Sequence, residues 1–359
     1  MLVSRALNFE YLQRNFRQII SSTWEETFIL DYIVIGAGQS GLAISHYLSQ
    51  QNCKYLVLDA NDKVGRSWLN RWDSLKLFTP SEYNHLPGLP FSFPKGYYPD
   101  KHQVAEYLQH YVEHHKMPIK HNQQVTNVEK EGGHFLVASN EEQFKSKHVI
   151  VATGPFHTPF IPECHENITE DVNQFHSENY ENPAQLKDGS ALVVGAGDSG
   201  VQILDEISKT NRTVYFSGCD TLKSIPQEFF GKTLWWWFSK IGVLSAHKYS
   251  WLGKKLKQGV QPIIGTDVKS VLARDNVRSV GRTLSANETT ITFEKANIDS
   301  IKNIIWATGY KPNFSWLKGI TYDESFYPNN FRGISSDLSG LAFIGLPWTY
   351  TRGSATLGA

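Results

Sequence analysis

Two copies of one glycine-rich motif carry the clearest chemical signal in this chain. Gly36-Ala37-Gly38-Gln39-Ser40-Gly41 follows the apolar run 31–35, and Gly195-Ala196-Gly197-Asp198-Ser199-Gly200 follows the apolar run 191–194. Each motif opens into a stretch with apolar residues at helical spacing, so both are expected at a strand–turn–helix junction. Glycines at such a junction let the backbone turn tightly and approach a pyrophosphate, which binds the amides that begin the helix. The spacing therefore predicts two dinucleotide sites.

The residue that ends the following strand distinguishes the two predicted sites. In the first site this residue is Asp59, whose carboxylate is placed to accept hydrogen bonds from an adenosine ribose, as FAD or NAD requires. In the second site the strand ends at Ser217 without a carboxylate, and Arg212 and Lys223 stand nearby. Because a carboxylate repels a 2′-phosphate and cations attract one, the second site favours NADPH over NADH. For Arg212 and Lys223 taken singly, ordinary surface charge is an equal alternative.

The order of apolar runs predicts an α/β fold of two Rossmann-like dinucleotide-binding domains. Ala152-Thr153-Gly154 and Ala307-Thr308-Gly309 each follow a buried run, so each unit is expected to close with the same strand and glycine turn. The last run, which contains Gly345, is expected to return to the first unit. The predicted division is an N-terminal extension at 1–27, a first part of the FAD-binding domain at 28–160, an inserted NADPH-binding domain with linkers at 161–310, and a second part of the FAD-binding domain at 311–359.

Composition narrows the class of protein. Lys plus Arg and Asp plus Glu both number 35, which gives no support to nucleic-acid binding. The three cysteines form no CxxC pair and no zinc-type spacing, so we expect no metal, no disulfide framework, no disulfide reductase and a cytoplasmic location. No stretch reaches the roughly 18 apolar residues of a transmembrane segment. The expected partners are a small-molecule substrate and O₂, and a homo-oligomer is left open.

One aromatic and basic segment stands apart from these patterns. Three consecutive tryptophans at 235–237 are followed by Lys240 and by lysines at 254, 255 and 257. The segment could line a substrate entrance, contact a membrane surface as an aromatic and basic patch, or pack the inserted domain. The sequence leaves these three interpretations open.

The chain as a whole resembles the flavin-dependent monooxygenases that have two dinucleotide-binding domains. It is similar in particular to the short bacterial CzcO-like oxidoreductases, which are relatives of the flavin-containing monooxygenases and the plant YUCCA enzymes. The resemblance covers residues 30–359. It rests on the two glycine loops and on Gly65, Trp68, Arg71-Trp72, Leu75–Pro80, Leu86–Pro90, Ala152–Gly154, His176–Tyr180, Trp306–Tyr310, Gly345–Trp348 and Arg352–Ser354.

The resemblance implies a mechanism and a set of contacts. NADPH would reduce FAD, the reduced flavin would react with O₂ to give a hydroperoxide sheltered by NADP⁺, and a small molecule would be oxygenated at a soft nitrogen or sulfur. The predicted FAD contacts are Gly36, Gly38, Gln39, Ser40, Gly41, Asp59, Gly65, Trp68, Arg71, Trp72, Val125, Ala152, Thr153, Gly154 and Gly345. The predicted NADPH contacts are Gly195, Gly197, Asp198, Ser199, Gly200, Arg212, Ser217, Lys223, Ala307, Thr308 and Gly309.

The catalytic candidates are Phe78 and Thr79, which stand at a departure from the family pattern, and His176, which the family's linker signature keeps. The linker signature keeps His176 but not its phenylalanine and glycine, which disfavours a Baeyer–Villiger enzyme. Phe78 or Thr79 takes the place of an asparagine that supports the hydroperoxide in many relatives, and an apolar residue at this position removes a hydrogen-bond donor. Relatives also continue into a further helix, so either the second FAD part is truncated or the site is completed differently. The alternatives are a flavin reductase or oxidase that releases H₂O₂ and a non-catalytic flavin-binding protein, and His176 can equally be a structural hydrogen-bond donor.

Overall fold

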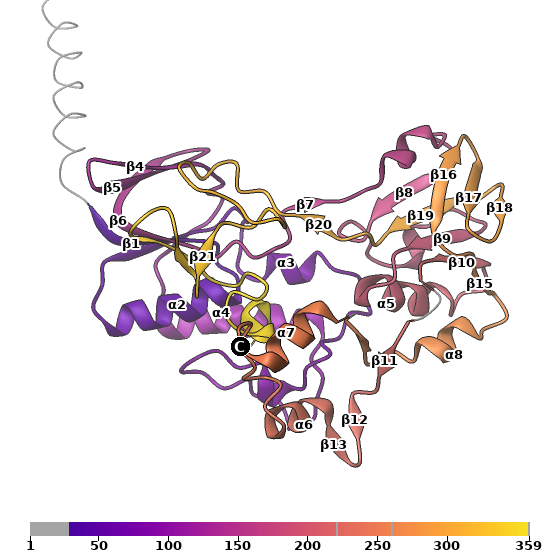
Figure 1. Ribbon diagram of the computed structural model, residues 1–359, viewed down its shortest axis with the longest axis horizontal. Coiled ribbons are helices and arrows are strands. Elements are labelled where there is room, and N and C mark those ends of the chain that lie inside the picture. The colour runs from indigo at the N-terminus through magenta and orange to yellow at the C-terminus, as the bar shows by residue number, and fades with distance from the viewer. Residues whose placement is uncertain (1–28, 220–221, 260, 358–359) are drawn as a thin grey trace, which may run out of the picture.

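Two sheets, each with its own helices, organise the chain into two lobes. The structure is a computed structural model and describes residues 29–357 except 220, 221 and 260. The predicted extension at 1–27 lies outside the described residues. Figure 1 shows the lobe that begins at β1 on the left and the lobe that contains β9 on the right. Two extended segments, β7 (Thr158–Pro159) and β20 (Tyr310–Lys311), cross between them as an antiparallel pair.

The first lobe is built on a sheet with the strand order β21-β22-β23-β6-β1-β2-β3 and with β4 and β5 extending from β6. Its central strands β1, β2 and β6 are parallel, as expected for apolar runs joined by helical crossovers. The bounds of the first six strands of this sheet are β1 Leu30–Ile35, β2 Tyr55–Leu58, β3 Ile119–Lys120, β4 Val125–Glu131, β5 His134–Ser139 and β6 Gln143–Val151. The helical elements are α2 Gln39–Gln50, α3 Arg66–Leu69, the 3₁₀ turn η1 Ser81–Tyr83 and α4 Lys101–His115.

The end of the chain completes the first sheet. Strand β23 (Leu341–Phe343) pairs in parallel with β6, so the prediction that the last apolar run returns to the first unit is confirmed. Two short strands precede it, β21 (Asn330–Phe331) and β22 (Ile334–Ser335), and the 3₁₀ turn η4 (Arg352–Ala355) follows it. The left lobe therefore consists of two pieces of chain that enclose the right lobe in sequence.

The second lobe repeats the arrangement on a smaller scale. Its five-stranded sheet has the order β15-β10-β9-β19-β8, and every pairing in it is parallel. These strands are β8 Asn173–His176, β9 Ala191–Val194, β10 Val214–Ser217, β15 Val277–Ser279 and β19 Asn303–Trp306, with helices α5 Asp198–Ile207 and α8 Val268–Leu272. The predicted α/β class with two Rossmann-like units is confirmed.

Smaller elements lie outside the two main sheets. An antiparallel sheet is formed by β16 Thr283–Asn287, β17 Thr290–Phe293 and β18 Asn297–Ile298. The others are η2 Glu163–Asn167, η3 Pro183–Gln185, β11 Ser224–Ile225, β12 Glu228–Phe229, β13 Lys232–Thr233, α6 Leu234–Lys240, α7 Trp251–Gln258 and β14 Ile263–Ile264. Within the described residues, no helix combines the length and hydropathy needed to cross a membrane, and no group of three His, Cys, Asp or Glu side chains could hold a metal.

Candidate functional site

The two glycine loops have the same backbone bonds in the two lobes. The amide of Gly36 donates to the carbonyl of Leu58 at 2.7 Å, and the amide of Gly195 donates to that of Ser217 at 2.9 Å. On the other side, the amide of Ala152 donates to Ile35 O at 2.8 Å and that of Ala307 to Val194 O at 2.7 Å. Each loop is thus held between the carboxyl ends of two neighbouring parallel strands, where ligands of doubly wound sheets bind.

Glycine is required at the third position of each loop because the backbone approaches too closely for a side chain. A Cβ at Gly41 would lie 1.9 Å from Gly36 O, and a Cβ at Gly200 would lie 2.1 Å from Gly195 O. These contacts bring the helix directly onto the preceding turn. The third glycines therefore serve the fold.

The middle glycine of each loop faces open space instead. A Cβ at Gly38 or at Gly197 would meet no atom within 4 Å. Both residues are N-caps without a side-chain hydrogen bond to the helix, so the first amides of α2 and α5 are not satisfied by a cap. Helix amides that no side chain caps, beside an open glycine, fit a pyrophosphate, which needs both donors and close backbone approach.

Asp59 lies at the predicted ribose position of the first loop. Its buried carboxylate accepts a hydrogen bond from the amide of Ala37 at 2.6 Å and another from the amide of Asn61 at 2.8 Å. These bonds hold the carboxylate beside the loop. Val125 begins β4 two residues after Gln123, whose amide donates to Asp59 O at 2.8 Å, so this predicted contact also lies on the Asp59 side of the loop.

The register of the second sheet corrects the ribose position of the second loop. Ile35 pairs with Leu58 in the first sheet, and Val194 pairs with Ser217 in the second. Ser217 therefore corresponds to Leu58, and Gly218 corresponds to Asp59. The hydroxyl of Ser217 is hydrogen-bonded to that of Thr283 at 2.7 Å and is buried. The sequence predicted that the second loop has no carboxylate at the ribose position. This prediction holds, but the position is that of Gly218, one residue after Ser217.

Arg212 does not belong to the second loop. It precedes the start of β10, whereas the glycine loop follows the opposite end of the neighbouring parallel strand β9. Its guanidinium donates to the carbonyls of Lys187 and Gly189 at 2.9 and 3.1 Å. The prediction that Arg212 contacts NADPH is wrong because nearness in sequence ignored strand direction. Lys223, which is exposed just before β11, stays a prediction.

The segment after Gly65 divides its aromatic residues between the two lobes. Gly65 packs against α4, where an added Cβ would lie 2.8 Å from the Cα of Ala105, so it has a structural role. Trp68 contacts the cores of both lobes. Trp72 lies in the core of the second lobe together with Tyr180, which corrects its prediction as a flavin contact. A sequence cannot reveal that a tryptophan next to a first-lobe helix packs in the other lobe.

Arg71 lies at the crossing between the lobes. Its guanidinium donates to the hydroxyl of Tyr310 at 2.6 Å and lies 5.7 Å from the centre of the Phe156 ring. Both partners flank the paired segments β7 and β20, so Arg71 is tied to the crossing. The predicted contact of Arg71 with FAD therefore stays a prediction.

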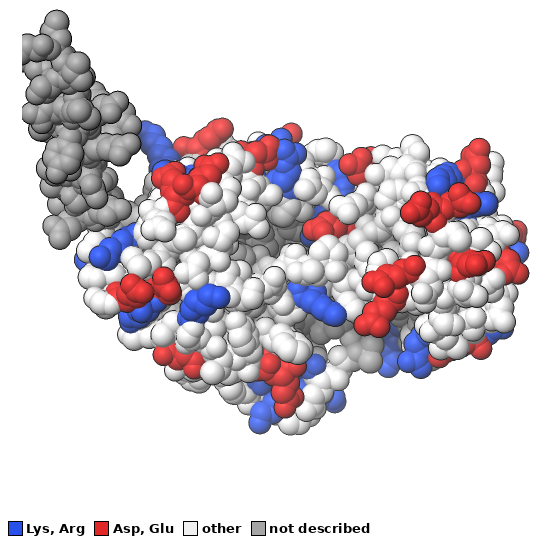
Figure 2. All heavy atoms as spheres, turned by 90° about the horizontal axis from the view of Figure 1, so that it is seen from above, with Lys and Arg blue, Asp and Glu red and all other residues white. Residues whose placement is uncertain are grey.

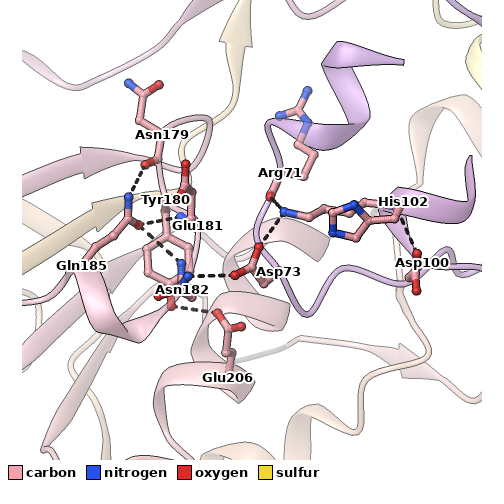
Figure 3. A network of polar contacts seen from close by, with 11 residues as sticks. Arg71, Asp73, Asp100, His102, Asn179, Tyr180, Glu181, Asn182, Gln185 and Glu206 are labelled. Atoms are coloured by element: carbon pink, nitrogen blue, oxygen red, sulfur yellow. Dashed lines mark hydrogen bonds and ion pairs between the residues drawn. The ribbon is translucent and has the colours of Figure 1, made fainter. Parts of the chain in front are cut away.

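A polar network next to Arg71 joins the first-lobe helix α4 to the second lobe (Figure 3). The ammonium of Lys101 is buried and donates to Asp73 at 2.7 Å and to the carbonyl of Arg71 at 2.6 Å. The same Asp73 carboxylate accepts from the side chain of Asn182 at 2.8 Å. Lys101 and Asn182 hold the pKa of Asp73 below its usual range, so the carboxylate is charged at neutral pH. Sequence reasoning missed this network because its members are far apart in the chain.

His176 uses both of its ring nitrogens inside the protein. Nδ1 accepts from the amide of Glu178 at 3.2 Å, so in the neutral ring Nε2 carries the proton and donates to the carbonyl of Gly309 at 3.0 Å. The carbonyl of Gly309 also accepts a hydrogen bond from the amide of Phe160 at 2.9 Å. The imidazole therefore connects β8 to the crossing segments, which supports the structural alternative.

Acidification is expected to weaken folding through His176. Burial lowers the pKa of His176, against a smaller opposing effect of its hydrogen bond to Gly309. At pH values between this lowered pKa and the unfolded value of about 6.5, the unfolded chain binds more protons than the folded protein. The free energy of unfolding therefore decreases as the pH falls from about 6.5. Urea unfolding at pH 7.5 and 5.5 measures this dependence. It should be smaller in His176→Gln, and an unchanged dependence would contradict the assignment.

A cavity of about 830 Å³ lies beside the end of the chain, next to the second loop. Asp198 of the second loop, Gly345 and the catalytic candidates Phe78 and Thr79 line it. Gly345 is in contact with the first loop, since an added Cβ would lie 2.6 Å from the hydroxyl of Ser40. The structure thus brings residues from both predicted sites to one cavity, although the candidates are separated by more than a hundred positions.

The aromatic segment provides a wall of this cavity. Trp235 and Phe238 of α6 line it, and the Trp235 ring stacks on Phe78 with centroids 5.9 Å apart. The indole Nε1 of Trp235 donates to the carbonyl of Phe78 at 3.0 Å. Of the three interpretations, the lining of a cavity therefore applies to Trp235 and Phe238.

Asn84 is a hydrogen-bonded neighbour of the catalytic candidate Thr79 that the sequence did not single out. Its fully buried side chain accepts from the hydroxyl of Thr79 and donates to the carbonyl of Thr79 at 2.9 Å. The hydroxyl hydrogen of Thr79 is thereby directed to Asn84 and away from the cavity. A hydroxyl followed five residues later by an asparagine is too common a pattern to have indicated this pair.

The remaining predicted contacts lie around the two loops. Thr153 bonds to the ring of His157 at 3.0 Å, and Thr308 donates to the carbonyl of Phe160, so both closing turns are bound to the crossing. Gln39 and Ser199 are half-buried in the first turns of α2 and α5. The backbone of Gly154 has a φ of +72° with open space beside it.

Comparison with known proteins agrees with this geometry. Residues 33–226 match the family described as pyridine nucleotide-disulphide oxidoreductase. An uncharacterized CzcO-like oxidoreductase from Geobacillus kaustophilus is 40% identical over 331 residues, which are 92% of this chain and 94% of the relative. The chain belongs to the CzcO-like oxidoreductases of the flavin-containing monooxygenase family.

More distant flavin monooxygenase relatives also cover most of the chain. A probable indole-3-pyruvate monooxygenase, YUCCA1 from Arabidopsis thaliana, is 26% identical over 84% of this chain and 82% of its own. A solved structure of a flavin monooxygenase variant from Stenotrophomonas maltophilia has a TM-score of 0.76 at 25% identity and covers 91% of this chain and 93% of its own. The CzcO-like protein is accordingly a flavin-dependent oxidoreductase. Its three cysteines form no disulfide in the described residues.

Proposed function

We propose that this CzcO-like protein is an NADPH-dependent FAD monooxygenase that oxygenates a small molecule in the cavity lined by Asp198 of the second loop and by Gly345. The loop at 36–41 with Asp59 binds FAD, and the loop at 195–200 binds NADPH. The FAD-binding domain comprises 28–160 and 311–359, and the NADPH-binding domain comprises 161–310. FAD, when bound, accepts a hydride from NADPH and activates O₂.

The observation that carries this proposal is the matched geometry of the two loops, together with a cavity lined by predicted contacts of both cofactors, Gly345 and Asp198. Each loop has an open middle glycine and uncapped helix amides, which suit a pyrophosphate. This cavity has a volume typical for small-molecule sites and is lined largely by apolar and aromatic side chains. Phe78, Trp235 and Phe238 would exclude water from the reacting atoms, which limits the loss of activated oxygen.

Release of H₂O₂ is a second candidate outcome. The hydroxyl of Thr79 donates to Asn84, and the amide group of Asn84 donates back to Thr79. The hydroxyl of Thr79 therefore offers no hydrogen to the cavity, and the buried Asn84 is not among the residues that line it. An oxygen species that lacks a donor here would be lost more readily as H₂O₂, which favours an NADPH oxidase over a monooxygenase.

Reduction under anaerobic conditions, followed by mixing with O₂, tests the proposal. The FAD-loaded protein should be reduced faster by NADPH than by NADH and should then transfer oxygen to a soft nitrogen or sulfur compound. Stoichiometric H₂O₂ with every candidate substrate would establish the oxidase instead. Protein that does not bind FAD at all would exclude both enzymes.

Gly218 gives a specific prediction about the coenzyme. A carboxylate at this position would face the ribose as Asp59 does in the first loop and would repel a 2′-phosphate. In Gly218→Asp we expect the ratio of kcat/KM for NADPH to that for NADH to fall at least about tenfold, because a charge repulsion of about 1.4 kcal/mol corresponds to that factor. An unchanged ratio would contradict the assignment of the second loop to NADPH.

The ratio is chosen as the readout because the substitution also strains the backbone. A Cβ at Gly218 would lie 2.9 Å from the Cβ of Ala196. Gly218→Ala carries the same strain without the charge and is the matched control. Its coenzyme ratio should stay near that of the unchanged protein.

A further inference from the structure

The aromatic–lysine segment, defined as residues 222–259, concentrates positive charge in a protein of zero net charge. It contains seven lysines and a single acidic residue, Glu228. No lysine in it forms an ion pair with a carboxylate among the described residues. On the face drawn in Figure 2, by contrast, basic and acidic side chains are interspersed.

Large apolar side chains of the same segment are exposed to solvent. Phe230 is 83% exposed, Trp251 75%, Ile241 62% and Phe229 53%. Several lysines lie beside aromatic rings, since the ammonium of Lys255 is 5.3 Å from the Trp251 ring and that of Lys232 is 5.7 Å from the Trp236 ring. Exposed apolar groups gathered in this way indicate an interaction surface.

The β12–β13 hairpin presents Phe230 in a strained conformation. Its two-residue turn, Phe230-Gly231, has φ values of +50° and +67°. This turn favours Asn-Gly, and a bulky residue in the left-handed region is disfavoured. The ring contacts its neighbour Phe229 but is otherwise mostly solvent-exposed, so burial within the chain does not compensate for the strain. Backbone strain of this kind is found where function requires it.

The hairpin is held firmly at the edge of the molecule. Figure 1 shows β12 and β13 below both sheets, next to α6. The indole of Trp237 in α6 donates to the carbonyl of Phe229 at 2.8 Å, and Thr233 caps the start of α6. The same helix lines the cavity through Trp235 and Phe238. The exposed aromatic groups are therefore presented on a rigid support that adjoins the candidate site.

We propose that the aromatic–lysine segment is a peripheral binding surface for a bilayer that contains anionic phospholipids. Aromatic side chains partition into the headgroup region, and lysines are attracted to anionic lipids. A second copy of the chain is a poorer occupant, because a twofold contact would oppose the two sets of lysines. Nucleic acid is also disfavoured, because the segment has no arginine for bidentate phosphate contacts. The proposal is independent of the flavin chemistry.

Vesicle flotation with the FAD-loaded full chain tests the proposal. We expect the protein to float with vesicles of phosphatidylcholine and phosphatidylglycerol at 70:30, to stay behind with phosphatidylcholine alone, and to dissociate at 0.5 M NaCl. Each lysine near an anionic surface is expected to change the partition coefficient about fivefold. Lys254→Glu with Lys257→Glu should therefore reduce it at least about 25-fold.

Two further variants separate the surface from net charge and from folding. Lys145→Glu with Lys269→Glu makes the same charge change at exposed lysines elsewhere and should bind vesicles nearly as the unchanged protein does. Phe230→Asn suits the turn better, so it should keep or raise the melting temperature while it lowers vesicle binding several-fold. An equal loss in both double variants would overturn the proposal. So would flotation with neutral vesicles alone, a Phe230-dependent dimer in size-exclusion chromatography, or preferential binding to DNA or RNA.

Discussion

A Gly38→Val variant is expected to fold normally and to lose FAD. The backbone of Gly38 has φ −75° and ψ 178°, which valine adopts readily, and a Cβ there would meet nothing within 4 Å. The valine methyl groups would instead occupy the space into which the pyrophosphate must come to reach the α2 amides. We expect the dissociation constant for FAD to rise at least about 100-fold, since more than about 2.7 kcal/mol of phosphate contacts would be lost. Absorbance near 450 nm of the purified protein and titration with FAD measure the loss.

Gly197→Val is the matched control for Gly38→Val. Its backbone, with φ −85° and ψ 177°, and its open surroundings are nearly identical, but it lies in the second loop. This variant should stay yellow and lose reduction by NADPH. Without FAD, the melting temperature of each variant should differ from that of the unchanged protein by no more than an ordinary surface substitution causes. Retained flavin in Gly38→Val, or flavin lost instead from Gly197→Val, would contradict the order of the two sites.

Trp306→Ala is expected to have the largest effect on stability. The indole is fully buried in the second lobe and donates to the side chain of Gln174 at 3.0 Å. Removal of a buried tryptophan costs about 3–5 kcal/mol of unfolding free energy. It also removes support from Ala307, against whose carbonyl Gly195 packs, so NADPH use should fall as well. Urea unfolding monitored by circular dichroism measures the free energy.

Trp251→Ala is the control for the same change at the surface. Trp251 is exposed in α7, so its removal should alter the free energy of unfolding by no more than about 0.5 kcal/mol. A similar loss in both variants would mean that burial of Trp306 does not stabilise the second lobe as the structure indicates.

The local features of both glycine loops were predictable because they depend on short stretches of chain. Apolar runs of four to six residues followed by GxGxxG specify a strand, a tight turn and a helix, and the structure has these elements in both places. The returning strand β23 was predictable for the same reason, because its apolar run needs a buried neighbour. The missing carboxylate in the second loop also followed from residue types alone.

Errors arose where a prediction depended on strand direction, register or the partner of a side chain. Arg212 is near Ser217 in sequence but at the opposite end of the parallel sheet, and Gly218 replaces Ser217 once the register of β9 and β10 is known. Trp72 packs in the second lobe although its neighbours in sequence belong to the first. Asn84 takes the hydroxyl hydrogen of Thr79, which residue types could not indicate.

Residue types and spacing were thus sufficient for the existence and kind of the two dinucleotide units, because glycine geometry and apolar periodicity act over a few residues. The tertiary structure decided which side chains share the cavity, how Lys101 and Asp73 join the lobes, and that the hairpin with Phe230 is exposed at the edge. Those features depend on packing between segments far apart in the chain. Periodicity describes which face of an element is buried, but it does not say which distant segment covers that face.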